Sequence, residues 1–458
     1  MMKLVSISPD NTLGVIGEVD ITTKSEIEDI VSKATKSFKA WSKLDLQERV
    51  SYLERLYKEF EKNKEELAEM GSKEMGMPIE ESLEDLESGL SYFRWYLDNA
   101  FKYISPEVSF ENKEEIHTVY YEPVGVVAVI MPWNYPFSNL IWGTIPSLIV
   151  GNTVVFKHSE EVPIVCKKYQ EIVESIGLPE NILNFIYGAG EVGDTLVHAD
   201  IDMIAFTGST KTGEYLYKVA AEKFIKVVLE MGGSAPGIVF EDADLDNVVE
   251  TVIFYRFGNC GQICDGLKRL IVQESVAEKL TDKLKSKVES LKIGSPIEED
   301  TNIGPLVAEK QLTLLEEQIK DSLAKGAKII TGGSKPDNLE GFYYKPTILE
   351  NVSEDMRVWK EEVFGPVLPI RTFKNYSEAI EMANDTPYGL GSYIFTNNEE
   401  FGVKAGRDLK TGMVSINGSF YVIPDDPFGG CKRSGIGREH GKWGLRELTE
   451  PKVIARYK

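Results

Sequence analysis

Cys264 stands in a stretch whose residue types suit a reactive thiol, Phe257-Gly258-Asn259-Cys260-Gly261-Gln262-Ile263-Cys264-Asp265-Gly266-Leu267-Lys268-Arg269. A nucleophilic cysteine reacts as the thiolate, so it needs partial exposure and a positive potential or a general base nearby. Gly258 and Gly261 permit the backbone bends and the close approach of a substrate that such a site requires. The alternative is that Cys264 is a small buried hydrophobe, which is the commoner role of a single cysteine. Motifs elsewhere in the chain must decide between the two.

Composition limits the classes of protein to which the chain can belong. It has 458 residues, of which 42% are hydrophobic and 27% charged, enough for about two or three globular domains. A net charge of −22 would repel nucleic-acid phosphates. The sequence starts without a basic segment and apolar run, and no apolar run reaches about eighteen residues, so we expect a cytoplasmic protein outside the membrane. Its four cysteines form no disulfide framework, and its four scattered histidines indicate no metal site.

The first hundred or so residues are predicted to be mainly helical. Apolar residues recur at helical spacing over Ser25–Trp41, Gln47–Glu69 and Glu80–Ala100, with lysines and glutamates between them. The stretch Phe101–Glu122 changes to alternation broken by a polar segment. That change predicts a β-hairpin.

Strands and helices are predicted to alternate over residues 124–231. Short apolar runs typical of strands cover 124–130, 153–156, 183–187, 203–207 and 226–231, with helical patterns between most of them. This rhythm is typical of an α/β fold with a parallel sheet covered by helices on both faces. Ligands of such sheets bind at the carboxyl ends of the strands.

Three of these strand ends carry residues that suit a dinucleotide. Lys157-His158-Ser159-Glu160 follows one strand, and Gly188-Ala189-Gly190-Glu191-Val192-Gly193 follows the next. The second segment fits the pattern GxGxxG, which is a weak indication by itself. Gly208-Ser209 opens a predicted helix, where free backbone N–H groups favour a phosphate. Together the three ends indicate a cofactor site.

A set of motifs resembles, in order, the signature motifs of the aldehyde dehydrogenase superfamily. They are Met131–Pro136, Phe206–Ser209, Leu229–Gly233, Gly261–Cys264, Glu361–Pro366 and Pro427–Gly430. The resemblance extends from about Gly14 to the C-terminus. It implies an aldehyde dehydrogenase-like α/β fold, with a Rossmann-like cofactor domain, an α/β catalytic domain and a β-hairpin oligomerisation element.

The same resemblance implies how the chain is divided. Residues 1–100 and 123–232 would form the cofactor-binding domain, and residues 233–432 the catalytic domain. Residues 101–122 and 433–458 would be oligomerisation and bridging elements that join subunits into a homodimer or homotetramer.

The resemblance assigns catalytic roles to Cys264, Glu230 and Asn134. Cys264 would attack the aldehyde carbon to give a thiohemiacetal, whose oxyanion is held by the Asn134 amide and the backbone N–H of Cys264. After hydride transfer to the cofactor, Glu230 would deprotonate the water that hydrolyses the thioester. The ordinary alternative for a glutamate at a strand end is a surface charge.

The resemblance also implies NAD as the cofactor, with NADP as an alternative. The predicted cofactor-binding residues are Trp133, Lys157, Glu160, Gly188, Gly208, Ser209, Glu362 and Phe364. Glu160 would hold a ribose hydroxyl and repel a 2′-phosphate, which favours NAD, although Lys157 can offset part of that repulsion. The alternative for Phe364 is a core aromatic.

Two departures from the family pattern bear on the substrate, a small aldehyde. Ser234 and Gly143 each replace a lysine that is common in the family. The motifs resemble a branch that includes succinate semialdehyde dehydrogenases, so succinate semialdehyde is the leading candidate. However, Tyr135–Thr144 contains no lysine or arginine, and only Arg256 or a more distant arginine could bind the substrate carboxylate.

Several other functions remain as alternatives. The substrate could be glyceraldehyde, lactaldehyde or a broad range of aldehydes. A coenzyme A-acylating relative would not need the base Glu230, and a non-catalytic protein would not need Cys264, Glu230 and Asn134 together. No GxSxG supports a serine hydrolase.

Overall fold

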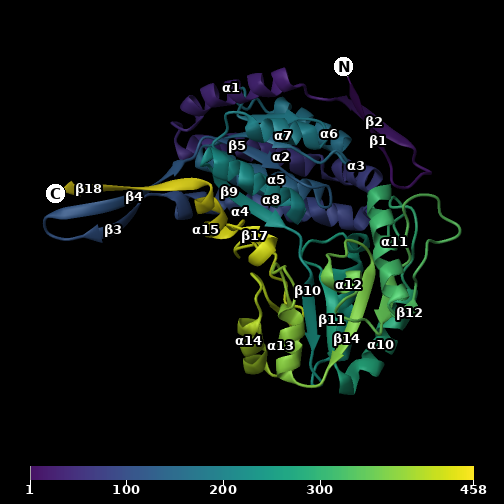
Figure 1. The fold of residues 1–458 in the computed structure, drawn as a ribbon. Coiled ribbons are helices and arrows are strands. Elements are labelled where there is room, and N and C mark those ends of the chain that lie inside the picture. Colours follow the sequence, from purple (N-terminus) through teal and green to yellow (C-terminus); the bar gives the residue numbers. More distant parts are fainter. Residues whose placement is uncertain (1) are drawn as a thin grey trace.

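The computed structural model describes residues 2–458. Two larger sheets form two layered bodies, one above the other in Figure 1. A three-stranded sheet projects from the upper body. Strands β1 (Lys3–Ile7) and β2 (Val15–Asp20) form a separate antiparallel pair.

The first sheet has six strands in the order β17-β9-β8-β5-β6-β7. Their bounds are β5 Val126–Ile130, β6 Thr153–Lys157, β7 Leu183–Ile186, β8 Met203–Gly208, β9 Lys226–Met231 and β17 Gly435–Ile436. All neighbouring pairs are parallel except β17 with β9. The parallel α/β sheet predicted from the sequence is therefore confirmed.

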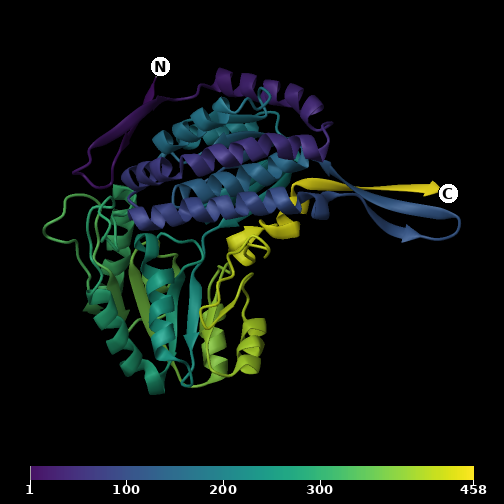
Figure 2. The same ribbon diagram turned by 180° about the vertical axis from the view of Figure 1, so that it is seen from behind.

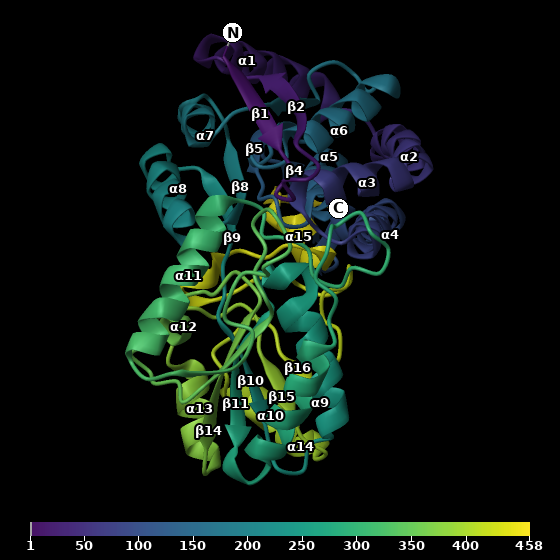
Figure 3. The same ribbon diagram turned by 90° about the vertical axis from the view of Figure 1, so that its right-hand side faces the viewer.

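Helices cover both faces of this sheet, as Figure 3 shows. Side chains of β5 point to the two faces in turn: Val126 and Ala128 join the core under α1, α7 and α8, and Val127 and Val129 join the core under α2–α6. The helix bounds are α1 Lys24–Trp41, α2 Leu46–Lys62, α3 Lys64–Met75, α4 Ile79–Ile104, α5 Pro136–Val150, α6 Pro163–Ser175, α7 Gly190–His198 and α8 Thr210–Lys223.

Two of the predicted helices differ from those in the structure. The run Gln47–Glu69 is two helices, α2 and α3, because Asn63 adopts a non-helical conformation between them. Helix α3 continues through Gly71 and ends only at Gly76, which is left-handed with φ 90°. Helix α4 extends to Ile104, so the hairpin begins later than residue 101.

The second sheet has seven strands in the order β12-β13-β14-β11-β10-β15-β16. Their bounds are β10 Ala235–Val239, β11 Leu267–Gln273, β12 Lys328–Thr331, β13 Thr347–Glu350, β14 Val367–Phe373, β15 Tyr393–Phe395 and β16 Ser415–Ile416. The accompanying helices are α9 Leu245–Val252, α10 Glu274–Glu289, α11 Glu309–Ala324, α12 Arg357–Lys360, α13 Tyr376–Asn384 and α14 Glu399–Asp408.

The projecting sheet consists of β3 (Glu107–Glu111), β4 (Glu115–Pro123) and β18 (Thr449–Tyr457). The predicted hairpin is present as β3 and β4, and β18 pairs along the whole of β4. Helix α15 (Gly441–Glu447) leads into β18. Figure 2 shows this sheet extending away from the body, with the C-terminus at its tip. Of the helices in residues 2–458, none combines the length and apolar character needed to cross a membrane.

Candidate active site

A pocket of about 1040 Å³ lies at the carboxyl ends of β5, β8 and β9. Cys264, Glu230 and Asn134 all line it, although they come from three distant parts of the chain. Asn134 follows β5, Glu230 ends β9, and Cys264 lies in the loop before β11. The structure thus brings together the three residues predicted to be catalytic, and their roles remain predictions.

The loop that carries Cys264 has an unusual backbone. A π-helical turn, Ile253–Phe257, leads into Gly258–Gly261, where Asn259 and Cys260 are left-handed with φ 47° and 54°. Such conformations cost free energy and persist only where the surroundings fix them. The Asn259 backbone N–H donates to the Glu81 carboxylate at 2.5 Å, and its side-chain amide donates to the Asn134 carbonyl oxygen at 2.7 Å. Glu81 therefore ties α4 to the loop before Cys264.

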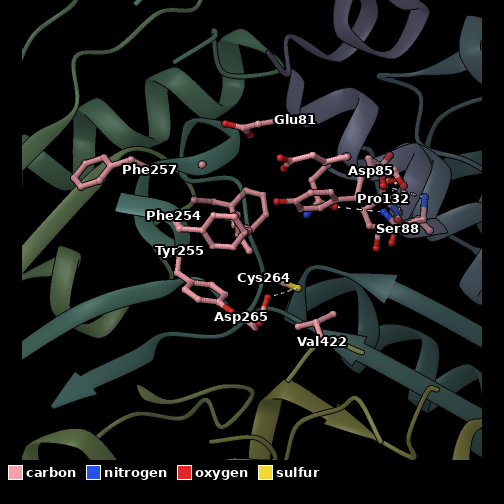
Figure 4. A pocket seen from close by; sticks show the side chains of 18 of the residues that line it. Glu81, Asp85, Ser88, Pro132, Phe254, Tyr255, Phe257, Cys264, Asp265 and Val422 are labelled. Atoms are coloured by element: carbon pink, nitrogen blue, oxygen red, sulfur yellow. Dashed lines mark hydrogen bonds between the residues drawn. The ribbon is translucent and has the colours of Figure 1, made fainter. Parts of the chain in front are cut away.

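Cys264 is half-buried, and Figure 4 shows its sulfur among pocket residues, with Tyr255 and Asp265 to one side and Val422 to the other. Burial raises the pKa of the Cys264 thiol well above its ordinary value, and Asp265 raises it further. The Asp265 Oδ1 atom lies 3.8 Å from Sγ. Lys268 acts in the opposite direction and lowers the pKa of the thiol.

Glu230 is 1% exposed, and neither of its carboxylate oxygens has a hydrogen-bond partner among residues 2–458. Burial raises its pKa well above the ordinary value, and the nearby Glu439 raises it further. Burial also raises the pKa of Glu439 to about 7. The raised pKa favours the neutral form of Glu230 in this conformation, and the residue can act as a base only as the carboxylate.

Asn134 is 5% exposed and lies beside the loop that carries Cys264. Its Nδ2 atom donates to the Gln262 carbonyl oxygen at 3.0 Å. Because a side-chain amide carries two donor hydrogens, the second remains available to an oxyanion. The geometry is compatible with the predicted oxyanion-binding role.

The predicted cofactor residues fall into two groups. Trp133, Gly208, Ser209, Glu362 and Phe364 line the pocket. Lys157, Glu160 and Gly188 do not line it and lie further along the same sheet edge, where Glu160 Oε2 is 3.9 Å from Lys157 Nζ.

The residues that line the pocket fit a dinucleotide. Ser209 caps α8, so the helix presents its first free N–H groups and its positive dipole end beside the pocket. A Cβ at Gly232 would lie 1.8 Å from the Glu362 carboxylate, so only glycine leaves that carboxylate room. Trp133 and Phe364 meet edge to face, with ring centroids 5.6 Å apart.

Sequence reasoning missed three residues of this site. Glu81 and Glu439 line the pocket, and the Lys268 ammonium group donates a hydrogen bond to the Cys264 carbonyl oxygen. Lys268 lies four residues after Cys264, so a positive charge close to the predicted nucleophile was visible in the sequence. Glu81 lies in a charge-rich helix whose pattern indicates only a solvated face.

Comparisons with known proteins show to which family the chain belongs. Residues 2–454 match the family model described as aldehyde dehydrogenase family. The chain is 38% identical to aminoaldehyde dehydrogenase 1 of Pisum sativum, described as peroxisomal, over 99% of this chain and 92% of that protein. It is 38% identical to betaine aldehyde dehydrogenase 1 of Oryza sativa subsp. japonica over 97% of this chain and 90% of that protein.

A solved structure is similarly close. Betaine aldehyde dehydrogenase from Staphylococcus aureus, crystallised with NAD+, superposes with a TM-score of 0.95 at 33% identity, covering 99% of this chain and 91% of that one. Both the sequence and the fold therefore match over nearly the whole length. The chain belongs to the aldehyde dehydrogenase family and is an NAD(P)-dependent aldehyde dehydrogenase.

Proposed function

We propose that this enzyme oxidises small aldehydes that carry a positive charge, such as aminoaldehydes or trimethylammonio aldehydes, with Cys264 as the nucleophile. The proposal rests on the described side chains that line the pocket, which include many carboxylic acids and no basic residue. Nine aspartate and glutamate residues line the pocket: Glu80, Glu81, Glu84, Asp85, Glu230, Glu250, Asp265, Glu362 and Glu439. No lysine, arginine or histidine of residues 2–458 lines it.

Arg256 does not supply the missing cation. It is fully buried, and its Nη2 atom donates to the carbonyl oxygens of Gly261, Val363 and Gly365. A substrate carboxylate would therefore enter a pocket that holds several carboxyl groups and no lysine, arginine or histidine among the described residues that line it, which is unfavourable. This charge distribution supports a cationic substrate over succinate semialdehyde.

Aromatic side chains support the same substrate class. The pocket is lined by Trp133, Tyr135, Trp142, Phe254, Tyr255, Phe257, Phe364, Phe420 and Phe428. Aromatic faces attract ammonium groups, and quaternary ammonium ligands above all. The acidic Asp265 lies beside Cys264, with its Oδ2 atom free of any hydrogen-bond partner among residues 2–458. The names of the pea and rice relatives given above, an aminoaldehyde and a betaine aldehyde dehydrogenase, fit this assignment.

The proposed chemistry uses three side chains in sequence. The Cys264 thiolate adds to the aldehyde carbon, while Asn134 and the backbone N–H of Cys264 stabilise the oxyanion. Glu362, Phe364 and the N-terminal end of α8 would hold NAD, which would accept the hydride that leaves the thiohemiacetal carbon and so leave a thioester on Cys264. Glu230 then deprotonates the water that attacks the thioester carbonyl, which releases the acid and restores the thiol.

If the substrate is cationic, the enzyme should prefer cationic four-carbon aldehydes over neutral and anionic ones. We expect kcat/KM for γ-trimethylaminobutyraldehyde and γ-aminobutyraldehyde to exceed that for butyraldehyde by about tenfold or more, because aromatic and carboxylate groups stabilise the cation. Succinate semialdehyde should be the poorest of the four. The measurement is initial rates of NADH formation at several substrate concentrations.

Asp265→Asn provides the matched test. It should reduce the ratio of kcat/KM between γ-trimethylaminobutyraldehyde and butyraldehyde, and this ratio cancels any effect on Cys264 that both substrates share. Succinate semialdehyde outperforming both cationic aldehydes would overturn the proposal.

Cofactor preference gives a second prediction. Glu160 lies between two lysines, with Lys157 Nζ at 3.9 Å and Lys310 Nζ at 3.7 Å, so its repulsion of a 2′-phosphate is partly offset. We expect NAD to give the higher kcat/KM, and Glu160→Gln to shift the ratio toward NADP by about fivefold. The exposed Glu180→Gln is the control and should leave the ratio unchanged. A wild-type enzyme that prefers NADP would contradict the role of Glu160.

The sequence also predicts how the chain is divided into domains and where the protein is located. We retain the division into a cofactor-binding domain (1–100 and 123–232), a catalytic domain (233–432) and bridging elements (101–122 and 433–458). Exposed apolar side chains on the projecting sheet, Val108, Phe110, Val453, Ile454 and Tyr457, support assembly into a homodimer or homotetramer. The free cysteines support a cytoplasmic location.

A further inference from the structure

Lys268 is a buried lysine whose ammonium group contacts the backbone of Cys264. Its side chain is 1% exposed. Nζ donates to the carbonyl oxygens of Cys264 and Gly233, each at 3.0 Å, and forms an ion pair with Glu362. The ring of Phe364 lies 5.0 Å from Nζ. The ammonium group thus joins the backbone of the predicted nucleophile to two residues of the pocket wall.

The other charged groups around Cys264 are acidic. The titratable side chains that face the thiol or share its part of the pocket are Tyr135, Glu230, Asp265, Lys268, Glu362 and Tyr421. Asp265 and Glu362 raise the pKa of the Cys264 thiol, and Lys268 lowers it. Among the described residues, Lys268 is the cation whose charge lowers the pKa of this thiol. A thiolate in so acidic a pocket needs such a counter-charge.

We propose that Lys268 is a positioning residue for the reaction: its charge stabilises the Cys264 thiolate, its hydrogen bond fixes the Cys264 backbone, and Glu362 moderates that charge. This inference rests on the proposed role of Cys264 as nucleophile. Ionisation breaks the S–H bond, leaves the electron pair on sulfur and releases the proton to solvent. Lys268 also donates to the carbonyl oxygen of Gly233, so the same ammonium group connects the backbone of two segments that meet at Cys264.

The test measures the pH dependence of alkylation at Cys264 in the full-length, cofactor-free protein. Iodoacetamide is the probe, and peptide mass spectrometry separates Cys264 from the other cysteines. Lys268→Met should raise the pH midpoint of alkylation by about one unit, because a nearby opposite charge shifts a pKa by about that much or more. Glu362→Gln should lower the midpoint. The exposed Lys279→Met should match the wild type.

Opposite shifts in the two variants distinguish an electrostatic role from a structural one. A folded Lys268→Met protein with the wild-type midpoint, or a Glu362→Gln protein with an unchanged or raised midpoint, would overturn the proposal. Circular dichroism and thermal unfolding check the fold, and if Lys268→Met does not fold, the direction of the Glu362→Gln shift decides. The midpoint does not depend on turnover, so failure here is distinct from failure of the proposed function, which activity in Cys264→Ala would reveal.

Discussion

Cys264→Ala is expected to reduce aldehyde oxidation by roughly 10⁴-fold or more, because the covalent step loses its nucleophile. Binding of NAD should remain close to wild type, since the thiol is distinct from the side chains predicted to hold the cofactor. Absorbance of NADH gives the rate, and calorimetric titration gives the affinity for NAD. Loss of activity together with loss of NAD binding would indicate a damaged pocket instead of a missing nucleophile.

Cys260→Ala is the matched control, because Cys260 lies in the same loop. Cys260 is 1% exposed and does not line the pocket. Its replacement should therefore leave most of the activity. Dehydrogenase activity that persists in Cys264→Ala, or that disappears in Cys260→Ala alone, would contradict the assignment of the nucleophile.

Glu230→Gln is expected to separate acylation from hydrolysis. If Glu230 activates only the hydrolytic water, the variant should form about one equivalent of NADH per active site in a burst and then stall by roughly 10²-fold or more. Rapid-mixing absorbance at limiting enzyme measures both phases. Loss of the burst itself would show that Glu230 also helps to form the thiolate.

The raised pKa of Glu230 adds a pH dependence to this prediction. Because the base acts as carboxylate, hydrolysis by the wild-type enzyme should slow as the pH falls below that pKa and quicken as the pH rises through it. The residual rate of Glu230→Gln should lack this dependence. Glu439→Gln should move the wild-type profile to lower pH, since it removes the neighbouring negative charge that raises the pKa of Glu230.

Much of the first sheet was predictable because its strands are short apolar runs between clear helical patterns. The strand predicted at 226–231 coincides with β9, and its last residues carry Glu230 to the pocket. Helix ends were less predictable. Gly71 lies inside α3, packed closely enough that an added Cβ would be 3.2 Å from Ser82 Oγ, so here glycine serves close packing and does not end the helix.

The three residues proposed to be catalytic stand in recognisable local motifs, whereas the residues that hold them in place do not. Glu81 contacts Asn259 across 178 positions of sequence, and nothing near either residue reveals that contact. Lys268 pairs with Glu362 across 94 positions. Such pairs are set by the packing of two sheets around the pocket, which no single stretch of sequence contains.

The substrate was least predictable for a related reason. A pocket's charge is the sum of residues from many segments, and the motifs that define the family cover only the nucleophile, the base and the cofactor. The short segment Tyr135–Thr144 indicated only that no cation is contributed there. The acidic lining of the pocket combines residues of α4, the end of β9 and the loop before β11, which are distant in the sequence.

The most direct test of the central claim is the intact mass of Glu230→Gln after the burst with NAD and γ-trimethylaminobutyraldehyde. We predict a mass increase equal to one acyl group per chain, with peptide mapping that places the thioester on Cys264. Cys264→Ala treated in the same way should show no adduct. An unmodified Glu230→Gln protein after a full burst, or an adduct on Cys260 or Cys431, would contradict the claim that oxidation proceeds through a thioester of Cys264.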